Sequence, residues 1–190
     1  MWFAFYSRTF VALKDMSSQC ILNTIRRHKV THIFAVPLLW ETVYKKFHLA
    51  LSKKEQNVQD KFKKGYAIVK KTKSRFLAKK LFKPVRELIF GDSICFLISG
   101  GSGIPQNVLE FFNVIGYHLA NGYGMSEVGI TSVETSKKFK HLTDCSIGKP
   151  FTQVEYKLND KGELLIKGKS VAKDILINGK VEDRPDGWYN

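Results

Sequence analysis

The sequence predicts an α/β fold, in which a partial parallel sheet flanked by helices is followed by a small subdomain built as a β-hairpin or barrel. In the first part of the 190-residue chain, helix and strand patterns alternate, as they do in parallel sheets. Two apolar strands run directly into glycine-rich segments, which is where α/β sheets bind ligands. From about residue 137 the pattern changes to the two-residue alternation of antiparallel strands.

This change of pattern divides the chain into an α/β subdomain, residues 1–136, and a β-rich subdomain, residues 137–190.

Hydrophobic residues make up 44% of the chain and aromatic residues 13%, so it is expected to fold. Apolar runs stay far below the ~20 residues that a membrane-spanning helix needs. The three cysteines are widely separated, with neither a metal spacing nor a disulfide framework. They suggest a reducing, cytoplasmic location.

The first elements are a strand, a helix, a second strand and a second helix. Residues 2–13 are almost wholly apolar and predict a buried strand, and one of the serines at 17–18 can cap the helix that follows. Residues 30–36 (VTHIFAV) are β-branched and aromatic and predict another buried strand. Pro37 fits the first turn of a helix over 38–49.

A strongly basic segment comes next, residues 45–86. It holds fifteen Lys or Arg against Glu55 and Asp60, and so carries +13 of the formal net charge of +14. Its apolar residues recur at helical spacing and predict a pair of amphipathic helices. These are either solvated helices or a surface for an anionic membrane or a polyanionic ligand. Nucleic acid is not predicted as a partner, because no motif that reads it accompanies the charge.

Two glycine-rich segments follow two further strands. The strand at 93–98 ends in residues 99–103 (SGGSG), and a helix from Pro105 to Gly116 leads into a short strand at 117–120. That strand enters a seven-residue segment, Asn121-Gly122-Tyr123-Gly124-Met125-Ser126-Glu127. Because carboxyl ends of parallel strands meet at one edge, the two segments are expected to converge on one cleft.

The seven-residue segment holds the side chains that a nucleotide site needs. Its glycines allow close approach of the backbone to a ligand. Tyr123 offers a flat face for a planar ring, Ser126 can donate to a phosphate oxygen, and Glu127 is an oxygen ligand of the kind that Mg²⁺ prefers. The alternative is an ordinary turn between a strand and a helix, since the same residue types dominate turns.

The β-rich subdomain begins with a hairpin. Apolar residues alternate over 154–158 and 164–166 on either side of a turn at 160–162. Residues 171–177 predict a further strand, and 184–190 a final turn without a closing element.

Several catalytic arrangements are absent from the sequence. The five histidines show no paired metal spacing, and no serine lies in a Gly-x-Ser-x-Gly elbow. The glycine spacing matches neither a dinucleotide fingerprint nor a phosphate loop ending in Gly-Lys-Ser/Thr. Cys145, beside Asp144, could act as a nucleophile only with a positioned base.

The motifs, taken in order, resemble those of the adenylate-forming (AMP-binding) superfamily, and within it the long-chain fatty acyl-CoA synthetases. The resemblance covers nearly the whole chain and rests on collinear runs: 36–44 (VPLLWETVY), 96–112 (FLISGGSGIPQNVLEFF), 121–127 (NGYGMSE), 147–150 (IGKP), 162–168 (GELLIKG) and 186–189 (DGWY). The basic insert 45–86 is also similar to the long-chain branch.

The resemblance implies roles for the glycine-rich segments. Gly100 and Gly101 would contact adenine and the acyl group through their backbone. In the second segment, Asn121 and Gly122 would line the adenine site, and Tyr123 would stack on the base. Gly124 and Met125 would pass beside the α-phosphate and the carboxylate. Ser126 would bind phosphate oxygens, and Glu127 would bind Mg²⁺. Ser126 and Glu127 would thus be the catalytic pair.

The reaction that the resemblance implies is activation of a fatty acid by ATP to an acyl-adenylate, followed by thioester formation with coenzyme A. AMP is then a bound product, and the parent enzyme is an acid–thiol ligase. Its expected location is cytoplasmic, and peripheral to a membrane if the basic insert binds one. Ser102 and Gly103 depart from the usual Ala-Pro, and Ser126 from the commoner Thr. The phosphate loop, the ribose-binding Asp and the C-terminal domain of the family are not in this sequence.

We therefore expect an internal fragment that lacks ATP–pyrophosphate exchange and associates with itself through unpaired strand edges. The alternatives are a fragment of a ligase that loads acyl groups onto a carrier protein, and a non-catalytic basic module that binds a membrane or a partner.

Overall fold

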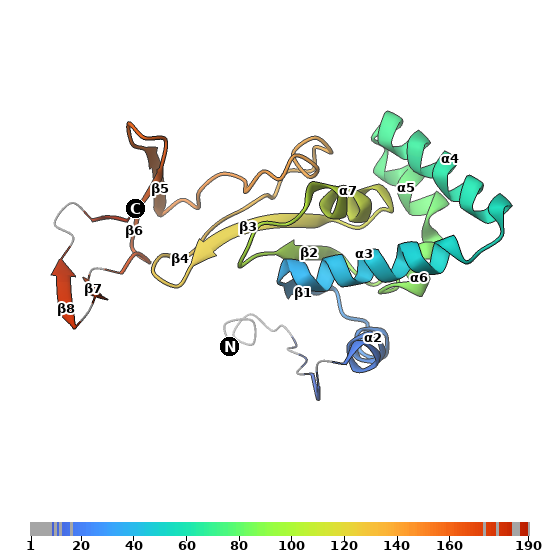
Figure 1. The fold of residues 1–190 in the computed structure, drawn as a ribbon, viewed down its shortest axis with the longest axis horizontal. Coiled ribbons are helices and arrows are strands. Elements are labelled where there is room, and N and C mark those ends of the chain that lie inside the picture. Colours follow the sequence, from blue (N-terminus) through green and yellow to red (C-terminus); the bar gives the residue numbers. More distant parts are fainter. Residues whose placement is uncertain are drawn as a thin grey trace.

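The computed structural model of the chain is drawn in Figure 1. It describes residues 9, 11, 13–15, 17–172, 174–177, 179–183 and 187–189. Most of the strand predicted for 2–13, all but residues 9, 11 and 13, and part of the turn predicted for 184–190 lie outside the described residues.

The first described elements follow the prediction closely. Helix α2, Ser18–Arg27, begins after Ser17, whose hydroxyl accepts a hydrogen bond from the Cys20 amide at 3.2 Å. Strand β1 is His32–Ala35 and helix α3 is Pro37–Ser52, with the proline in its first turn. The strand is not wholly buried as predicted, because its side chains alternate between two faces and Phe34 is 60% exposed.

The basic segment forms three helices where the sequence predicted two. Helix α4 is Gln56–Thr72, α5 is Arg75–Leu81 and α6 is Lys83–Leu88. A break after α4 places Lys73 in the left-handed region at φ 54°. Phe82 ends α5, and Pro84 starts α6 because proline suits a first turn but cannot continue a helix. Figure 1 places α4 and α5 at one end of the molecule.

A four-stranded sheet in the order β1-β2-β3-β4 lies at the centre. Strand β2 is Phe96–Ser99, and helix α7, Gln106–Val114, connects it to β3, Leu119–Met125. Strand β4 is Gly129–Val133. The first three strands are parallel and β4 is antiparallel to β3. The predicted strand at 117–120 therefore begins later and continues to Met125, so most of the predicted seven-residue loop is strand.

The core lies between the sheet and its helices and is mainly aromatic. Trp40 of α3 meets Phe112 of α7 edge-on at 5.6 Å between ring centroids, and Phe90 at 6.1 Å. Tyr44 of α3 meets Phe111 of α7 in the same way at 5.2 Å. Such edge-to-face pairs add about 0.5–1.5 kcal/mol to the burial of the rings. They fix α3 and α7 against each other.

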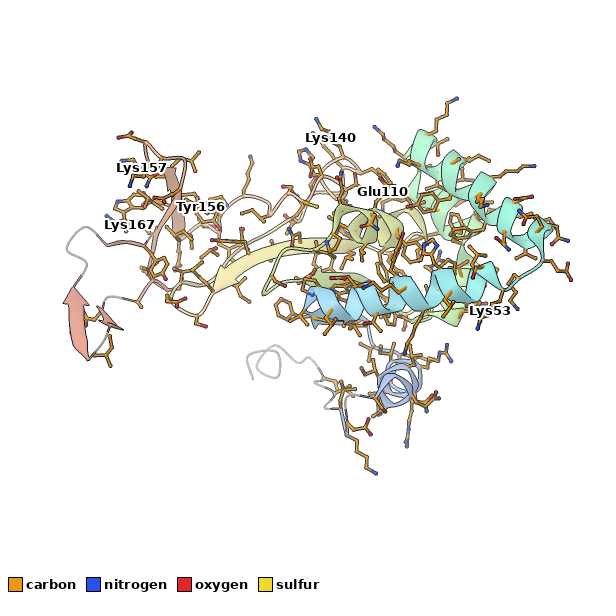
Figure 2. All side chains as sticks on the ribbon, in the orientation of Figure 1. Lys53, Glu110, Lys140, Tyr156, Lys157 and Lys167 are labelled. Carbon is orange, nitrogen blue, oxygen red and sulfur yellow. The ribbon has the colours of Figure 1, made fainter. Side chains whose placement is uncertain are left out.

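The β-rich part contains the predicted hairpin. Strand β5, Val154–Leu158, pairs with β6, Leu164–Gly168, and β7, Asp174–Ile177, pairs with β8, Lys180–Asp183, in a separate sheet. The end of the chain is not only a turn, because β9, Trp188–Tyr189, adds to β6. Figure 2 labels Tyr156 on β5. Its hydroxyl hydrogen-bonds with Thr131 at 2.6 Å and with Ser132 at 3.0 Å, which joins β5 to β4.

No helix among the described residues is both long and apolar enough to cross a membrane.

Candidate functional site

The two glycine-rich segments meet at their first residues, whereas the single cleft predicted between them stays a prediction. Ser99, the last residue of β2, is paired in parallel register with Asn121 of β3. The Gly100 amide donates to the carbonyl of Ala35, the last residue of β1, at 3.2 Å. We call residues 99–103 together with 121–127 the carboxyl edge. Three neighbouring strands thus end at this edge.

The first segment is buried at Gly100 and exposed at residues 101–103. A Cβ atom on Gly100 would lie 3.2 Å from the Phe34 ring and 3.7 Å from the Gly122 carbonyl oxygen, so a side chain there would press against that ring. Gly101 has φ +89°, a conformation that other residues rarely adopt. These two glycines let the side chains of Phe34 and Val36 lie against the backbone, an arrangement that we call the Gly100 cradle.

The second segment is a strand followed by a hairpin turn. The register of β3 on β4 shifts between Tyr123 and Gly124 in a bulge. A side chain on Gly124 would clash with the backbone of Gly129 across the hairpin. Gly124 is therefore required by the close approach of two strands, independently of any ligand.

The turn after β3 presents Ser126 and Glu127. The Val128 amide donates to the Met125 carbonyl at 3.2 Å, and the Ala172 amide donates to the Glu127 carbonyl at 2.8 Å. The backbone of the turn is thus fixed on both sides. Ser126 is exposed and Glu127 half-buried. The structure gives the two side chains no hydrogen bond or ion pair within the described residues, so both are available to a ligand.

Asn121 and Tyr123 are held differently. The side-chain amide of Asn121 is buried and donates to the Cys145 carbonyl at 3.1 Å, and its backbone carbonyl accepts from the Glu134 amide at 2.9 Å. Asn121 therefore anchors the segment after β4 to the edge. Tyr123 is half-buried, and its carbonyl accepts from Thr131 Oγ1 at 3.2 Å.

Cys145 does not have the environment of a nucleophile. Burial raises the pKa of its thiol, and the nearby Asp144 carboxylate raises this pKa further. A raised pKa keeps the sulfur protonated, whereas a reactive cysteine needs the thiolate.

Sequence reasoning missed three residues at the edge. Ser99 Oγ is buried and has no hydrogen-bond partner among the described residues. Phe34 and Val36 are 60% and 53% exposed, and they flank Gly100 and Gly101. Their positions were a usable signal in the sequence. Residues two apart on a strand lie on the same face, so Phe34 and Val36 share one side of β1 and its end. Nothing in the sequence indicated that Ser99 would be left unpaired.

The edge offers one carboxylate for a metal ion. Among the described residues, no group of three or more His, Cys, Asp and Glu side chains is placed to hold a metal. Mg²⁺ in nucleotide sites is usually held by one or two carboxylates together with phosphates and water. Glu127 alone therefore fits a Mg²⁺ ion that arrives with a nucleotide.

The family model for AMP-binding enzymes matches residues 1–176. The chain belongs to the AMP-binding enzyme family. This confirms the superfamily resemblance found in the motifs.

Relatives within the family are acid–thiol ligases. The chain is 29% identical over 191 residues to long-chain-fatty-acid–CoA ligase 3 of Saccharomyces cerevisiae, a match that covers 93% of this chain and 27% of the yeast protein. It is 30% identical over 107 residues to a chloroplastic long-chain-fatty-acid–[acyl-carrier-protein] ligase of Arabidopsis thaliana, covering 49% of this chain and 14% of that relative. The chain thus spans less than a third of either relative.

The fold is also found in solved members of the family. The structure of o-succinylbenzoate CoA synthetase from Bacillus subtilis, in complex with its acyl-adenylate intermediate, matches with a TM-score of 0.61 at 21% identity. The match covers 96% of this chain and 32% of that one. It confirms the mixed α/β architecture of the adenylate-forming N-terminal domain.

Proposed function

We propose that this chain is the nucleotide-binding segment of an ATP-dependent long-chain fatty acid–CoA ligase. The observation that carries the proposal is the parallel pairing of Ser99 with Asn121. It places the Gly100 cradle and the strand that leads to Ser126 and Glu127 at one edge of the sheet. Likeness to the fatty acid ligases supports the substrate class.

In this proposal each part of the edge has a physical task. Gly100, Gly101 and Gly122 keep side chains away from the adenine and the acyl group, and the Tyr123 ring stacks on the base. Gly124 and Met125 carry the chain past the α-phosphate. Ser126 donates to a phosphate oxygen and Glu127 holds Mg²⁺. Bound ATP would supply the phosphorus centre that the fatty carboxylate attacks, and the fixed turn orients it.

Nucleotide titration tests these roles. We expect the chain to bind ATP in the presence of Mg²⁺, measured by calorimetry. Tyr123→Ala should weaken binding roughly tenfold or more, since a base–aromatic stack contributes about 1–3 kcal/mol. Glu127→Gln should remove the dependence on Mg²⁺, whereas the matched control Glu155→Gln, on exposed β5, should bind as the parent does. Equal affinities in all four proteins would overturn the proposal.

A carrier-protein thiol is the second candidate acceptor, favoured by the Arabidopsis relative. Coenzyme A and acyl carrier protein should be supplied in turn to a full-length protein that contains this chain. Thioester formation only with the carrier protein would replace the first proposal.

We further propose that the basic segment contacts an anionic membrane surface. Phe76 of α5, within this segment, and Leu88, two residues beyond its end, are 80% and 72% exposed. Exposed apolar side chains beside cations are typical of surfaces that bind anionic lipid. Vesicles with 30% phosphatidylserine should sediment the chain, and Phe76→Ser should release it. Equal sedimentation by neutral vesicles would contradict the electrostatic part.

Self-association through the outer edge of β1 is a separate proposal. Among the described residues, β1 pairs in the central sheet with β2 alone, and a strand with one free side can pair with another chain. Light scattering should report association that depends on concentration, and Phe34→Lys should reduce it. A monodisperse parent would refute this.

A further inference from the structure

A short stretch of chain after β4 contacts the end of the first glycine-rich segment. We call residues 143–146 the bridging segment. Gln106, the first residue of α7, donates from its side-chain amide to the Thr143 carbonyl at 3.0 Å. The thiol of Cys145 donates to the Ile104 carbonyl at 3.7 Å. The bridging segment is therefore bonded to the backbone directly after the first glycine-rich segment and to the start of the helix that follows.

Cys145 also contacts the second glycine-rich segment, through its carbonyl. Asn121, the first residue of that segment, donates its side-chain amide to the Cys145 carbonyl at 3.1 Å. The backbone of Cys145 has φ 61°, in the left-handed region. A residue other than glycine keeps this conformation only where its surroundings hold it there. One residue in a constrained conformation thus connects the two glycine-rich segments.

The carboxylate of Glu134 holds the bridging segment in place. Glu134 directly follows β4 and is 6% exposed. Its Oε2 accepts from the Ser146 hydroxyl at 2.6 Å, and its Oε1 accepts from the Ser136 amide at 2.7 Å. No cationic side chain of the described residues forms an ion pair with it. Because a buried charge is costly unless it is hydrogen-bonded, these two neutral donors are what keeps the carboxylate inside the fold.

Glu134 is also bonded to Asn121 through the backbone, which closes a ring. The Glu134 amide donates to the Asn121 carbonyl at 2.9 Å. The ring runs from the Asn121 side chain to Cys145, along the chain to Ser146, and through the Glu134 carboxylate back to Asn121. Each member is fixed against two others, so a displacement of Ser146 is passed to Cys145 and from there to both glycine-rich segments.

We propose that Glu134 is a positioning residue of the candidate nucleotide site. Its carboxylate sets the place of the bridging segment, and the bridging segment sets the separation between the Gly100 cradle and Asn121. The proposal rests on the proposed nucleotide function, because it concerns the arrangement of the groups that would line the adenine site. Glu134 acts through Ser146 and Cys145, and not by contact with the ligand.

Two variants of Glu134 test this role in the 190-residue chain, by calorimetric titration with ATP and Mg²⁺. Glu134→Ala removes both acceptors and should weaken ATP binding about tenfold, the factor that one hydrogen bond to a charged group contributes. Glu134→Gln keeps an acceptor oxygen for Ser136 and places an amide against the Ser146 hydroxyl, so it should restore most of the affinity. Equal affinities of the parent and Glu134→Ala would overturn the proposal, as would a complete lack of restoration by glutamine.

Glu110→Ala is the matched control for a loss of stability alone. Glu110 lies on α7 and is labelled in Figure 2. Its Oε1 accepts from the Tyr66 hydroxyl at 3.2 Å and from the Lys70 ammonium at 2.8 Å, away from the bridging segment. Each alanine variant thus loses two hydrogen bonds to a carboxylate, and only Glu134→Ala should lose ATP affinity. Equal losses of affinity in the two folded variants would leave Glu134 a structural role only.

Thiol labelling tests the ring without a nucleotide. Cys145 is the single cysteine in a protein that carries Cys20→Ser and Cys95→Ser. Its rate of reaction with a thiol reagent reports release of the thiol from the Ile104 carbonyl. Glu134→Ala should raise this rate about tenfold, by loss of one hydrogen bond to a charged group. Ser146→Ala should raise the rate similarly, and the double variant no further, because both changes break the same contact. Independent, multiplying increases would contradict the ring.

The two assays separate this proposal from the proposed function. A parent that binds no ATP would overturn the nucleotide function, and with it any positioning role in that function, even where labelling shows the ring. A parent that binds ATP while Glu134→Ala labels at the parent rate would overturn the positioning role alone.

Discussion

Two buried polar side chains at opposite ends of the parallel sheet, Arg86 and Ser99, differ in their hydrogen bonding. Beyond the amino ends of the strands, the buried guanidinium of Arg86 finds acceptors on every side. At the carboxyl edge, Ser99 Oγ is buried without a partner among the described residues. A buried polar group without a hydrogen bond costs about 1–3 kcal/mol. The first arrangement stabilises the fold, and the second leaves the Ser99 hydroxyl without that compensation.

The buried guanidinium of Arg86 has hydrogen-bond partners from several elements. Its guanidinium is paired with Asp92 at 2.8 Å and donates to the carbonyls of Lys79 at 3.0 Å and Ile115 at 3.1 Å. The hydroxyl of Tyr117 donates to the Arg86 carbonyl at 3.0 Å. One side chain thus joins α5, α6, the end of α7 and the approach to β2.

Replacing Arg86 should give the largest loss of stability. Arg86→Met leaves buried carbonyls at Lys79 and Ile115 without a donor. It should lower the free energy of unfolding by about 2–4 kcal/mol, measured in urea. Asp92→Asn is the control and should cost less than about 1 kcal/mol, because the Asp92 side chain is 40% exposed. A loss below 1 kcal/mol for Arg86→Met would remove the contrast between the two ends.

Tyr156→Phe tests the contact between β5 and β4, the strand that pairs with β3. It removes the hydrogen bonds of the tyrosine hydroxyl with Thr131 and Ser132, two fully buried residues of β4. We expect a loss of about 1–2 kcal/mol in the same assay. Lys157→Gln, at the exposed neighbouring position, should change stability by less than about 0.5 kcal/mol. Equal losses in the free energy of unfolding for the two variants would mean that the hydrogen bonds of Tyr156 to β4 do not stabilise the fold.

Ser99→Ala should act in the opposite direction. It removes a buried hydroxyl that has no protein partner, so the free energy of unfolding should rise by about 1 kcal/mol. ATP affinity should fall if that hydroxyl serves the ligand. A variant that is less stable than the parent would show that Ser99 is bonded within the fold.

His118 is tested through the pH dependence of stability. Burial, followed by Arg75 and Lys137, lowers the pKa of His118 to about 4 from its usual 6.5. The unfolded chain therefore takes up a proton first, and the stability that His118 contributes above pH 6.5 is lost as the pH falls towards 4. Thermal unfolding should be less sensitive to pH over this interval in His118→Phe. Identical profiles for parent and variant would contradict the shift.

Local signals predicted most of the elements but not the bonding of the edge. Ser17 and Pro37 marked the starts of α2 and α3 correctly, because caps and first-turn prolines act through neighbouring residues. The segment at 121–125 was predicted as a loop because glycine and asparagine disfavour strands. Pairing with β2 and β4 overrides that preference, and such pairing depends on residues far away in the chain.

The candidate site shows the same limit. Tyr123, Ser126 and Glu127 could be named from their side-chain chemistry and from the resemblance. The cradle beside Phe34 and the unpaired hydroxyl of Ser99 depend on how three strands end together. The bridging segment likewise depends on contacts between distant parts of the chain, which local patterns in the sequence cannot reveal.

The register of β1 on β2 has a consequence for the order of folding. His32 pairs with Phe96, and helices α3, α4, α5 and α6 lie between these residues in the chain. Met125, by contrast, pairs with Gly129 across a short turn. Contacts between distant segments form slowly because a long loop must close first. The hairpin that presents Glu127 is therefore expected to form early, and the cradle that Phe34 completes should appear only when the last strand pair closes.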